Sequence, residues 1–144
     1  MIGSVLFACS ENALRSPMAE AIAKHHFGSR IYVDSVGVRE SEIDPFAVEV
    51  LAEIGIDASR HVAKRMDDLL DTSFDLIVSL SPEAHHRSVE LTRSSAAEVE
   101  YWNTVDPSLV EGNRETRLDA YRGLRDWLTA RIHERLAQGD DPIP

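Results

Sequence analysis

The chain has 144 residues, the length of one ordinary domain, and its 43% apolar and 28% charged residues are typical of globular proteins. No run of about 18 apolar residues occurs, which excludes a membrane-spanning helix of the usual length. The 25 acidic and 15 basic residues give a net charge of −10, which argues against non-specific binding to nucleic acid.

Short apolar or β-branched runs alternate with longer helical patterns along the chain. Strands are predicted at residues 4–8, 31–36, 74–80 and 98–102. A capping residue followed by proline predicts three helix starts, at Ser16-Pro17, Asp44-Pro45 and Ser81-Pro82, and two glycines predict helix ends, Gly28 and Gly55. The last predicted helix spans about residues 114–137, with apolar residues at three- and four-residue spacing.

Strands that alternate with helices predict parallel strands joined by right-handed crossovers, and therefore an open α/β sheet covered by helices on both faces. No repeat or linker divides the chain, so residues 1–137 are predicted to form one domain, followed by a frayed tail at 138–144. Ligands of such sheets bind beyond the carboxyl ends of the strands, which directs attention to the residues after the first strand.

The single cysteine, Cys9, ends that strand and is followed by a loop of five residues, Arg15 and a helix. A loop that runs into a helix N-terminus points free backbone N–H groups at one place, and Arg15 adds a forked cation suited to phosphate-like oxyanions. A thiolate facing these donors is stabilised and becomes a nucleophile. The Ser16 hydroxyl is predicted either to cap the helix or to hydrogen-bond this thiolate. A lone cysteine forms no internal disulfide, and we expect a cytoplasmic protein.

Two stretches around this loop, Val-Leu-Phe-Ala-Cys at residues 5–9 and Arg-Ser-Pro-Met-Ala-Glu at 15–20, resemble the opening signature of the low-molecular-weight protein tyrosine phosphatases and of the arsenate reductases of the same fold. Residues 34–37, 55–57, 61–64 and 106–107 resemble later segments of that family. The resemblance spans nearly the whole chain. It implies a four-stranded parallel sheet, a thiolate nucleophile, and neither a metal nor a cofactor.

The resemblance also implies a role for each matching residue. Cys9 would attack phosphorus, Arg15 would hold the phosphate oxygens, and Asp106 would protonate the leaving group and later activate water. Asn12 would be held in place by Ser16 and by two more distant residues, Ser35 and His61. The implied substrate-binding residues are Ser10, Glu11, Asn12, Ala13, Leu14 and Ser16. Without the resemblance, Asp106-Pro107 predicts only a turn, and His61 is expected to be structural.

The sequence departs from the family pattern at four places. Glu11 replaces the usual glycine and adds a negative charge beside the expected phosphate site, so it should either slow turnover of simple aryl phosphates or favour substrates with a basic group. Leu14 stands where many of these phosphatases have a second cysteine. The other two are Ser108-Leu109, in place of a tyrosine pair, and the segments 101–102 and 111–112, which look more like the arsenate reductases.

These features predict a cysteine-dependent phosphomonoesterase that acts on a phosphorylated protein, a small phosphate ester or another tetrahedral oxyanion. One alternative is an arsenate reductase that depends on an external small thiol, because an internal disulfide relay needs two further cysteines. The other is a catalytically weakened oxyanion-binding regulatory module, for which Glu11 is the main argument. We expect neither nucleic acid nor a membrane as a partner, and the sequence makes no prediction of the oligomeric state.

Overall fold

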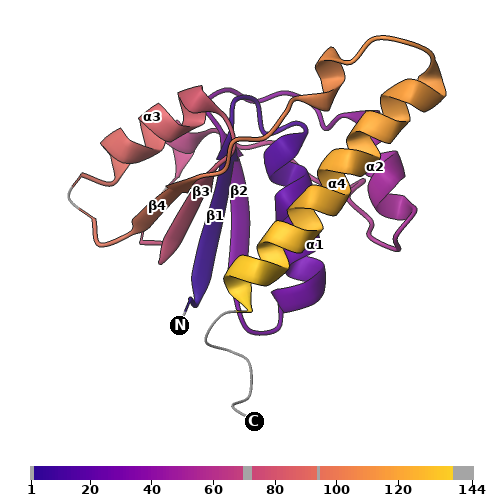
Figure 1. Cartoon of the computed structure of the whole chain (residues 1–144). Helices are drawn as coiled ribbons and strands as arrows, with labels where there is room; N and C mark the ends of the chain where they lie inside the picture. The colour runs from indigo at the N-terminus through magenta and orange to yellow at the C-terminus, as the bar shows by residue number, and fades with distance from the viewer. Residues whose placement is uncertain (1, 70–72, 94, 138–144) are drawn as a thin grey trace.

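The computed structural model describes residues 2–69, 73–93 and 95–137. The predicted tail at 138–144 lies outside the described residues. Strands and helices alternate as the sequence predicts (Figure 1). The strands are β1 (Ser4–Cys9), β2 (Tyr32–Gly37), β3 (Leu76–Ser79) and β4 (Glu98–Tyr101). The α-helices are α1 (Arg15–Phe27), α2 (Pro45–Ala52), α3 (Pro82–Leu91) and α4 (Arg114–Leu136), and the short 3-10 helices are η1 (Met66–Asp68) and η2 (Pro107–Leu109).

The strands form one parallel sheet in the order β2-β1-β3-β4. In the centre of the sheet, Phe7 of β1 pairs with Ser35 of β2 on one side and with Val78 of β3 on the other. The chain leaves β1 toward β2 and returns to the opposite side of β1 at β3. This reversal opens a crevice at the carboxyl ends of β1 and β3, the place where ligands bind in open α/β sheets.

Helices cover both faces of the sheet, as predicted (Figure 1). The larger apolar cluster joins one face to α1, α2 and α4, and the smaller cluster includes Ala84 of α3 and Met66 of η1 on the other face. Burial on both faces explains why β1 and β3 are apolar at almost every position. The predicted apolar positions of the last helix are all buried: Leu118, Tyr121, Leu128, Ile132 and Leu136.

The helix starts follow two of the three predicted caps. The Asp44 carboxylate accepts a hydrogen bond from Phe46 N at 2.8 Å, and the Ser81 hydroxyl accepts one from Ala84 N at 3.2 Å. The prediction of a cap at Ser16 is wrong. Helix α1 already begins at Arg15, so Ser16 lies inside its first turn, and no side chain caps the helix. The Ser16 hydroxyl is therefore available for the loop that precedes the helix.

The two predicted helix ends differ in their geometry. Gly28 directly follows α1 and keeps a helical conformation, with its N–H donating to Lys24 O at 2.9 Å. Helix α2 ends at Ala52, and Gly55 lies in the following turn with φ +81°, a left-handed conformation that favours glycine. None of the helices in the described ranges is long and apolar enough to cross a membrane.

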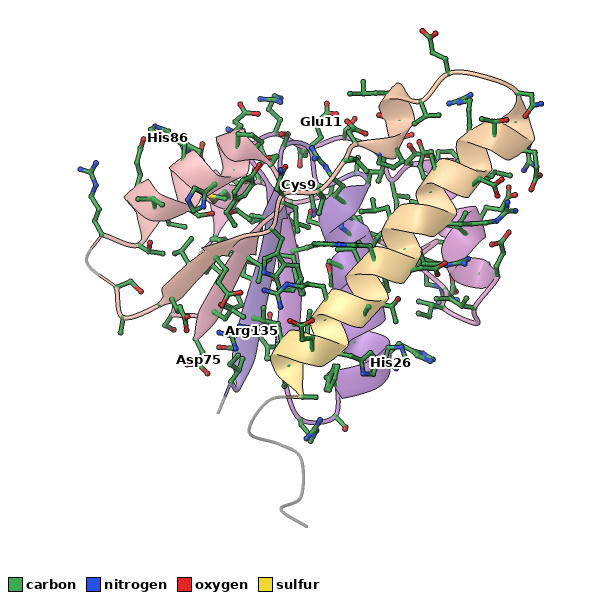
Figure 2. All side chains as sticks on the ribbon, viewed as in Figure 1. Cys9, Glu11, His26, Asp75, His86 and Arg135 are labelled. Carbon is green, nitrogen blue, oxygen red and sulfur yellow. The ribbon has the colours of Figure 1, made fainter. Side chains whose placement is uncertain are left out.

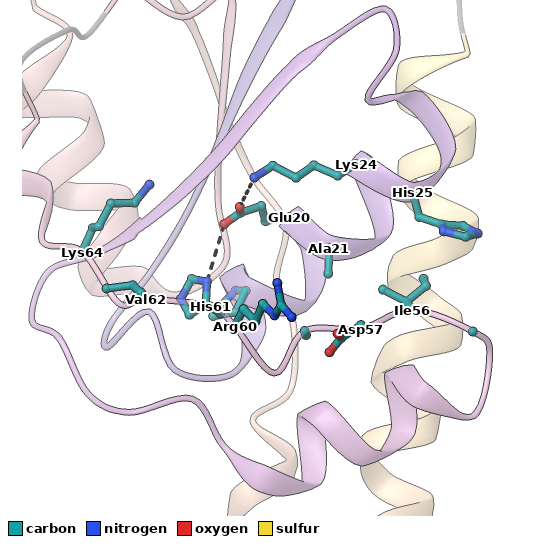
Figure 3. A pocket seen from close by; sticks show the side chains of 13 residues that line it. Glu20, Ala21, Lys24, His25, Ile56, Asp57, Arg60, His61, Val62 and Lys64 are labelled. Carbon is teal, nitrogen blue, oxygen red and sulfur yellow. Dashed lines mark hydrogen bonds and ion pairs between the residues drawn. The ribbon is translucent and has the colours of Figure 1, made fainter.

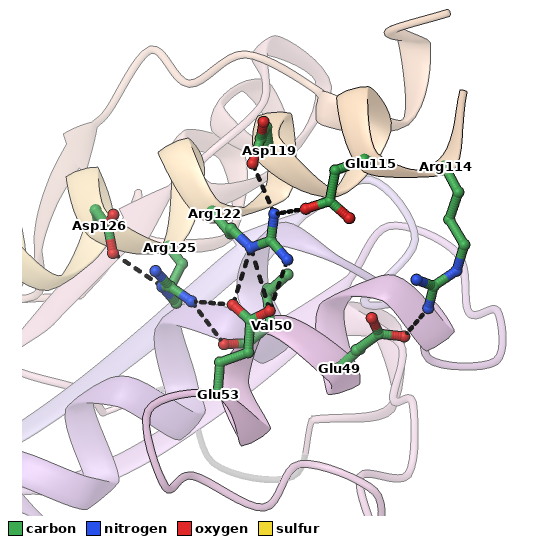
Figure 4. Close-up of polar contacts among 9 residues, drawn as sticks. All are labelled: Glu49, Val50, Glu53, Arg114, Glu115, Asp119, Arg122, Arg125 and Asp126. Atoms are coloured by element: carbon green, nitrogen blue, oxygen red, sulfur yellow. Dashed lines mark hydrogen bonds and ion pairs between the residues drawn. The ribbon is translucent and has the colours of Figure 1, made fainter. Parts of the chain in front are cut away.

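A cluster of ion pairs ties α2 to α4 on the outer side of the molecule (Figure 4). Glu53, the residue after α2, accepts hydrogen bonds from Arg122 Nη2 and from Arg125 Nη1, both at 2.8 Å. Arg125 also donates to the backbone oxygen of Val50 at 2.9 Å. The hydrogen bonds from Arg122, with those from Arg125, lower the pKa of the Glu53 carboxyl to about 2.

Candidate active site

The loop between β1 and α1 lies at the carboxyl edge of the sheet, where Figure 2 labels Cys9 and Glu11. The segment after β2 runs beside this loop. Its amides at positions 38, 39, 41 and 44 donate to the carbonyl oxygens of residues 9, 10, 11 and 13 at 2.8–3.1 Å. A Cβ atom at Gly37 would lie 2.6 Å from the amide nitrogen of Asn12, so only glycine permits this close approach.

With the loop carbonyls turned toward that segment, the loop amides remain free. In the described part of the chain, the backbone N–H groups of residues 10–15 donate to no protein acceptor. Such a run of unpaired amides at a helix N-terminus is suited to bind an anion with several oxygens.

Cys9 lies at the base of this loop, and its side chain is almost fully buried. Its Sγ is 2.9 Å from the Ser16 Oγ. The Ser16 hydroxyl is also 3.3 Å from the carbonyl oxygen of Val36, and it accepts a hydrogen bond from the Asn12 side-chain amide at 2.9 Å. A thiolate can only accept hydrogen bonds, so an ionised Cys9 would accept one from the Ser16 hydroxyl. Of the two predicted roles for Ser16, the structure supports the contact with sulfur.

Asn12 fixes the shape of the loop from behind. It is fully buried and has φ +52°, a left-handed conformation that few side chains adopt. Its Nδ2 donates to Ser16 and to Ser35, both at 2.9 Å, and its Oδ1 accepts from Lys64 N at 2.9 Å and lies 3.2 Å from His61 Nε2. Every hydrogen-bonding position of this amide is therefore used, and the loop conformation is pinned from three separate segments.

A cavity of about 600 Å³, shown in Figure 3, is lined by Glu20 and by His61, the residue that contacts Asn12. The Glu20 carboxylate accepts hydrogen bonds from the Ser35 hydroxyl and, at 2.6 Å, from Lys24 Nζ. His61 Nδ1 is 3.8 Å from the same carboxylate. Two of the residues that contact Asn12, Ser35 and His61, thus lie against Glu20, which sequence reasoning did not single out.

Arg15 and Asp106 line the same pocket, and each is held by other contacts. The guanidinium of Arg15 donates to the backbone oxygen of Thr104 at 3.2 Å, and the Thr104 hydroxyl donates to Leu80 O at 2.8 Å. Asp106 caps η2, and its Oδ1 accepts from the Ser108 amide at 3.0 Å and from the Ser108 hydroxyl at 2.6 Å. Thr104 was missed because no local pattern indicates its contact with Arg15.

A pocket of about 640 Å³ brings together Cys9, Arg15 and Asp106, the three residues predicted to be catalytic. Ser10, Glu11, Ala13 and Leu14 also line it. The buried side chains of Asn12 and Ser16 support the loop from behind and do not line the pocket. The arrangement provides a nucleophile, an anion seat and an acid within one pocket.

One further pair of charges lies at the mouth. Arg39 lines the pocket and makes a forked ion pair with Glu83, with nitrogen–oxygen distances of 2.7 and 3.0 Å. Arg39 lowers the pKa of the Glu83 carboxyl, and Glu83, with a smaller contribution from Glu11, raises the pKa of Arg39. No sequence pattern indicates this pair, because its members are 44 residues apart.

Comparisons with known proteins point to one family. The sequence model of the low molecular weight phosphotyrosine protein phosphatases matches residues 4–136. An arsenate reductase of Halalkalibacterium halodurans is 34% identical over 128 residues, which cover 89% of this chain and 91% of that protein.

Two solved structures are similar in fold. An arsenate reductase in the phosphate-binding state has a TM-score of 0.76 and 26% identity, covering 95% of this chain and 98% of that chain. The YwlE arginine phosphatase, solved as a cysteine-to-serine variant with a phosphorylated active-site serine, has a TM-score of 0.76 and 25% identity, covering 95% of this chain and 97% of that chain. The family match includes every strand and helix that builds the pocket, and the chain therefore belongs to the low molecular weight phosphotyrosine protein phosphatase family.

Proposed function

We propose that the protein is a cysteine-dependent phosphomonoesterase that works through a phosphorylated Cys9. The observation that carries this proposal is the set of unpaired amides at residues 10–15, which directly follow Cys9 in a loop that shares a pocket with Asp106. This combination is what phosphoryl transfer to sulfur requires: seats for the phosphate oxygens, a nucleophile in line, and a proton donor for the leaving group.

In the first step, the Cys9 thiolate attacks phosphorus while the loop amides and the Arg15 guanidinium hold the equatorial oxygens. The sulfur–phosphorus bond forms as the bond from phosphorus to the leaving oxygen breaks, and Asp106 gives its proton to that oxygen. In the second step, the Asp106 carboxylate takes a proton from water, which attacks phosphorus. The sulfur–phosphorus bond then breaks, inorganic phosphate leaves, and the Cys9 thiolate is regenerated.

The substrates we propose are a phosphorylated protein or a small phosphate ester. Phosphoarginine belongs among the test compounds, because a similar structure is that of an arginine phosphatase. We also propose a cytoplasmic location, since a reducing compartment keeps the single thiol available for catalysis.

A second candidate function is arsenate reduction, which is favoured by the name of the relative at 34% identity. Cys9 would attack arsenate and expel one of its oxygens as water, which forms a sulfur–arsenic bond. An external thiol would then attack the Cys9 sulfur and break that bond, so that arsenite leaves with two electrons and the two sulfur atoms become a mixed disulfide. A second external thiol would have to reduce that disulfide, because Cys9 is the only cysteine in the sequence. The route therefore depends on a small thiol in solution.

The test measures the hydrolysis of phosphoarginine and of aryl phosphates with good and poor leaving groups, and the reduction of arsenate to arsenite with added thiol. We expect phosphatase turnover in the wild type and none in Cys9→Ser, which should still bind phosphate through the amides and Arg15. Arg15→Lys should also be inactive, since a point charge does not replace the guanidinium fork. Turnover by Cys9→Ser would overturn the mechanism, and thiol-dependent arsenite release without phosphatase activity would favour the second candidate.

The role of Asp106 is tested by its asparagine variant. Asp106→Asn should slow turnover of esters with poor leaving groups by roughly 10²–10⁴-fold, and that of good leaving groups less, because only a poor leaving group needs the proton. An equal loss for both kinds of ester would mean that Asp106 positions the substrate rather than donating a proton.

A further inference from the structure

The pocket that holds the proposed phosphate site has an acidic mouth. Six charged side chains line it: the guanidinium groups of Arg15 and Arg39 and the carboxylates of Glu11, Glu42, Asp44 and Asp106. A phosphate dianion that enters this pocket therefore meets more carboxylates than cations, an unusual lining for an enzyme that binds a bare anion.

Most of these groups are already engaged with the protein. Arg39 is held in its fork with Glu83. The Asp44 carboxylate accepts from the Tyr121 hydroxyl at 2.6 Å as well as from the helix it caps. Asp106 accepts from Ser108.

Glu11 and Glu42 differ from these groups. Both side chains are exposed, and within the described residues neither carboxylate accepts a hydrogen bond or forms an ion pair closer than 4.0 Å. The charge of Glu11 contributes to the raised pKa of Arg39, but the hydrogen bonds of the Arg39 guanidinium go to Glu83. Of the four carboxylates in the lining, only these two have no hydrogen-bond or ion-pair partner among the described residues.

The backbone places these two carboxylates on the same rim. The Ser41 amide donates to Glu11 O at 3.0 Å, and the Asp44 amide donates to Ala13 O at 2.8 Å. The backbone of Glu42 lies between these two bonds and is therefore held beside the loop, and both Glu11 and Glu42 line the pocket. A substrate seated on the loop amides would extend past both carboxylates as it leaves the pocket.

We propose that Glu11 and Glu42 select phosphorylated residues that lie within basic peptide segments, with arginine or lysine beside the phosphate. This proposal rests on the phosphatase function proposed above. The basic side chains of the substrate offset the repulsion between the phosphate and the two carboxylates, and the net charge of −10 draws a basic partner toward the protein. A phosphate without such neighbours meets the repulsion alone.

The experiment uses three phosphotyrosine peptides of equal length, in which the residues beside the phosphate are arginine, glutamine or aspartate. We measure kcat/KM for each peptide at low and high ionic strength, in the wild type, Glu11→Gln and Glu42→Gln. The matched control is Glu134→Gln, which removes the same charge near the far end of α4, away from the pocket.

The wild type should prefer the arginine peptide, then the glutamine peptide, then the aspartate peptide. Each glutamine variant at the rim should reduce the ratio of the arginine to the aspartate peptide by roughly two- to fivefold, the range of exposed ion pairs. High salt should shrink the wild-type preference, and Glu134→Gln should leave it unchanged. No preference in the wild type, or an unchanged ratio in both rim variants, would overturn the proposal.

A binding arm separates this proposal from the proposed reaction. The affinities of Cys9→Ser for the same three peptides report the charge preference without turnover. If no peptide is hydrolysed but the arginine peptide binds most tightly, the phosphatase function fails and the charge selection stands. If all three are hydrolysed equally well and bind equally well, the function stands and the charge selection fails.

Discussion

Thr104 joins three parts of the candidate site through one residue. Its carbonyl oxygen accepts from the Arg15 guanidinium, its hydroxyl donates to Leu80 O at the end of β3, and it stands two residues before Asp106. The hydrogen bond from the Thr104 hydroxyl to Leu80, the residue after β3, holds the start of the segment that carries Asp106. We therefore assign Thr104 a positioning role.

Replacing Thr104 with valine keeps the shape of the side chain and removes its hydrogen bond. The bond contributes about 1 kcal/mol, so kcat/KM for esters with poor leaving groups should fall by roughly fivefold, and less for good leaving groups. Thr104→Ser keeps the hydroxyl and should restore the leaving-group dependence of the wild type. If the valine variant lost the same factor for both kinds of ester, Thr104 would not act through Asp106.

The left-handed conformation of Asn12 gives a second prediction at this scale. Asn12→Ala and Asn12→Gly both remove the hydrogen bonds to Ser16, Ser35 and Lys64, but only glycine adopts φ +52° without strain. Both variants should be less stable than the wild type in denaturant unfolding. The free energy of unfolding of the alanine variant should be lower than that of the glycine variant by about 1 kcal/mol. Equal stabilities of the two variants would show that the backbone relaxes at this position.

That Cys9, Arg15 and the loop between them line one pocket could be predicted, because they are contiguous in sequence and follow a strand. The contacts of Glu20, Thr104 and Arg39 could not, because each depends on how distant segments meet after folding. Ser16 shows the limit of local rules, since serine before proline favours a cap but the nearby sulfur and Asn12 compete for the hydroxyl. Tertiary contacts decided that competition.

At the scale of elements, the strand and helix pattern was predicted well because burial on both faces leaves long apolar runs in β1 and β3. Strand ends were predicted less accurately. The strand predicted at residues 74–80 spans only Leu76–Ser79 in the structure, which are the residues that pair with β1 and β4. The ion pairs between α2 and α4 were not predicted, since exposed acids and arginines are frequent throughout the chain.

Those ion pairs make stability depend on pH. The pKa of Glu53 is about 2 in the folded protein and near 4.5 when unperturbed, so its contribution is present above about pH 4.5 and is lost as the pH falls through 2. Glu53→Gln should lower the melting temperature at neutral pH. The difference in melting temperature between this variant and the wild type should shrink as the pH falls from about 4.5 to about 2. Glu49→Gln removes a pair with Arg114 alone and should have a smaller effect. A pH-independent difference for Glu53→Gln would contradict the assignment.

The whole molecule has one thiol, which determines how it responds to oxidants. A sulfenic acid at Cys9 has no second cysteine with which to form an internal disulfide. Peroxide should therefore inactivate the enzyme, with over-oxidation following unless an external thiol is present, and inorganic phosphate in the pocket should slow the loss. Mass spectrometry and recovery of activity with thiol measure both steps. A sulfenate that persists and is fully recoverable would contradict this prediction.

The position of Cys9 in the sheet has a consequence for protein synthesis. Cys9 is made within the first strand, but the segments that complete its pocket follow later in the chain: Arg39, residues 41–45, and finally Asp106 and Ser108. At about 5–20 residues per second, the ribosome needs roughly 5–20 seconds to add that stretch. Phosphate should therefore slow the reaction of Cys9 with thiol reagents in the complete chain, but not in stalled nascent chains that end before Asp106. The residue on which the proposed chemistry depends is translated well before the pocket that would hold its substrate is complete.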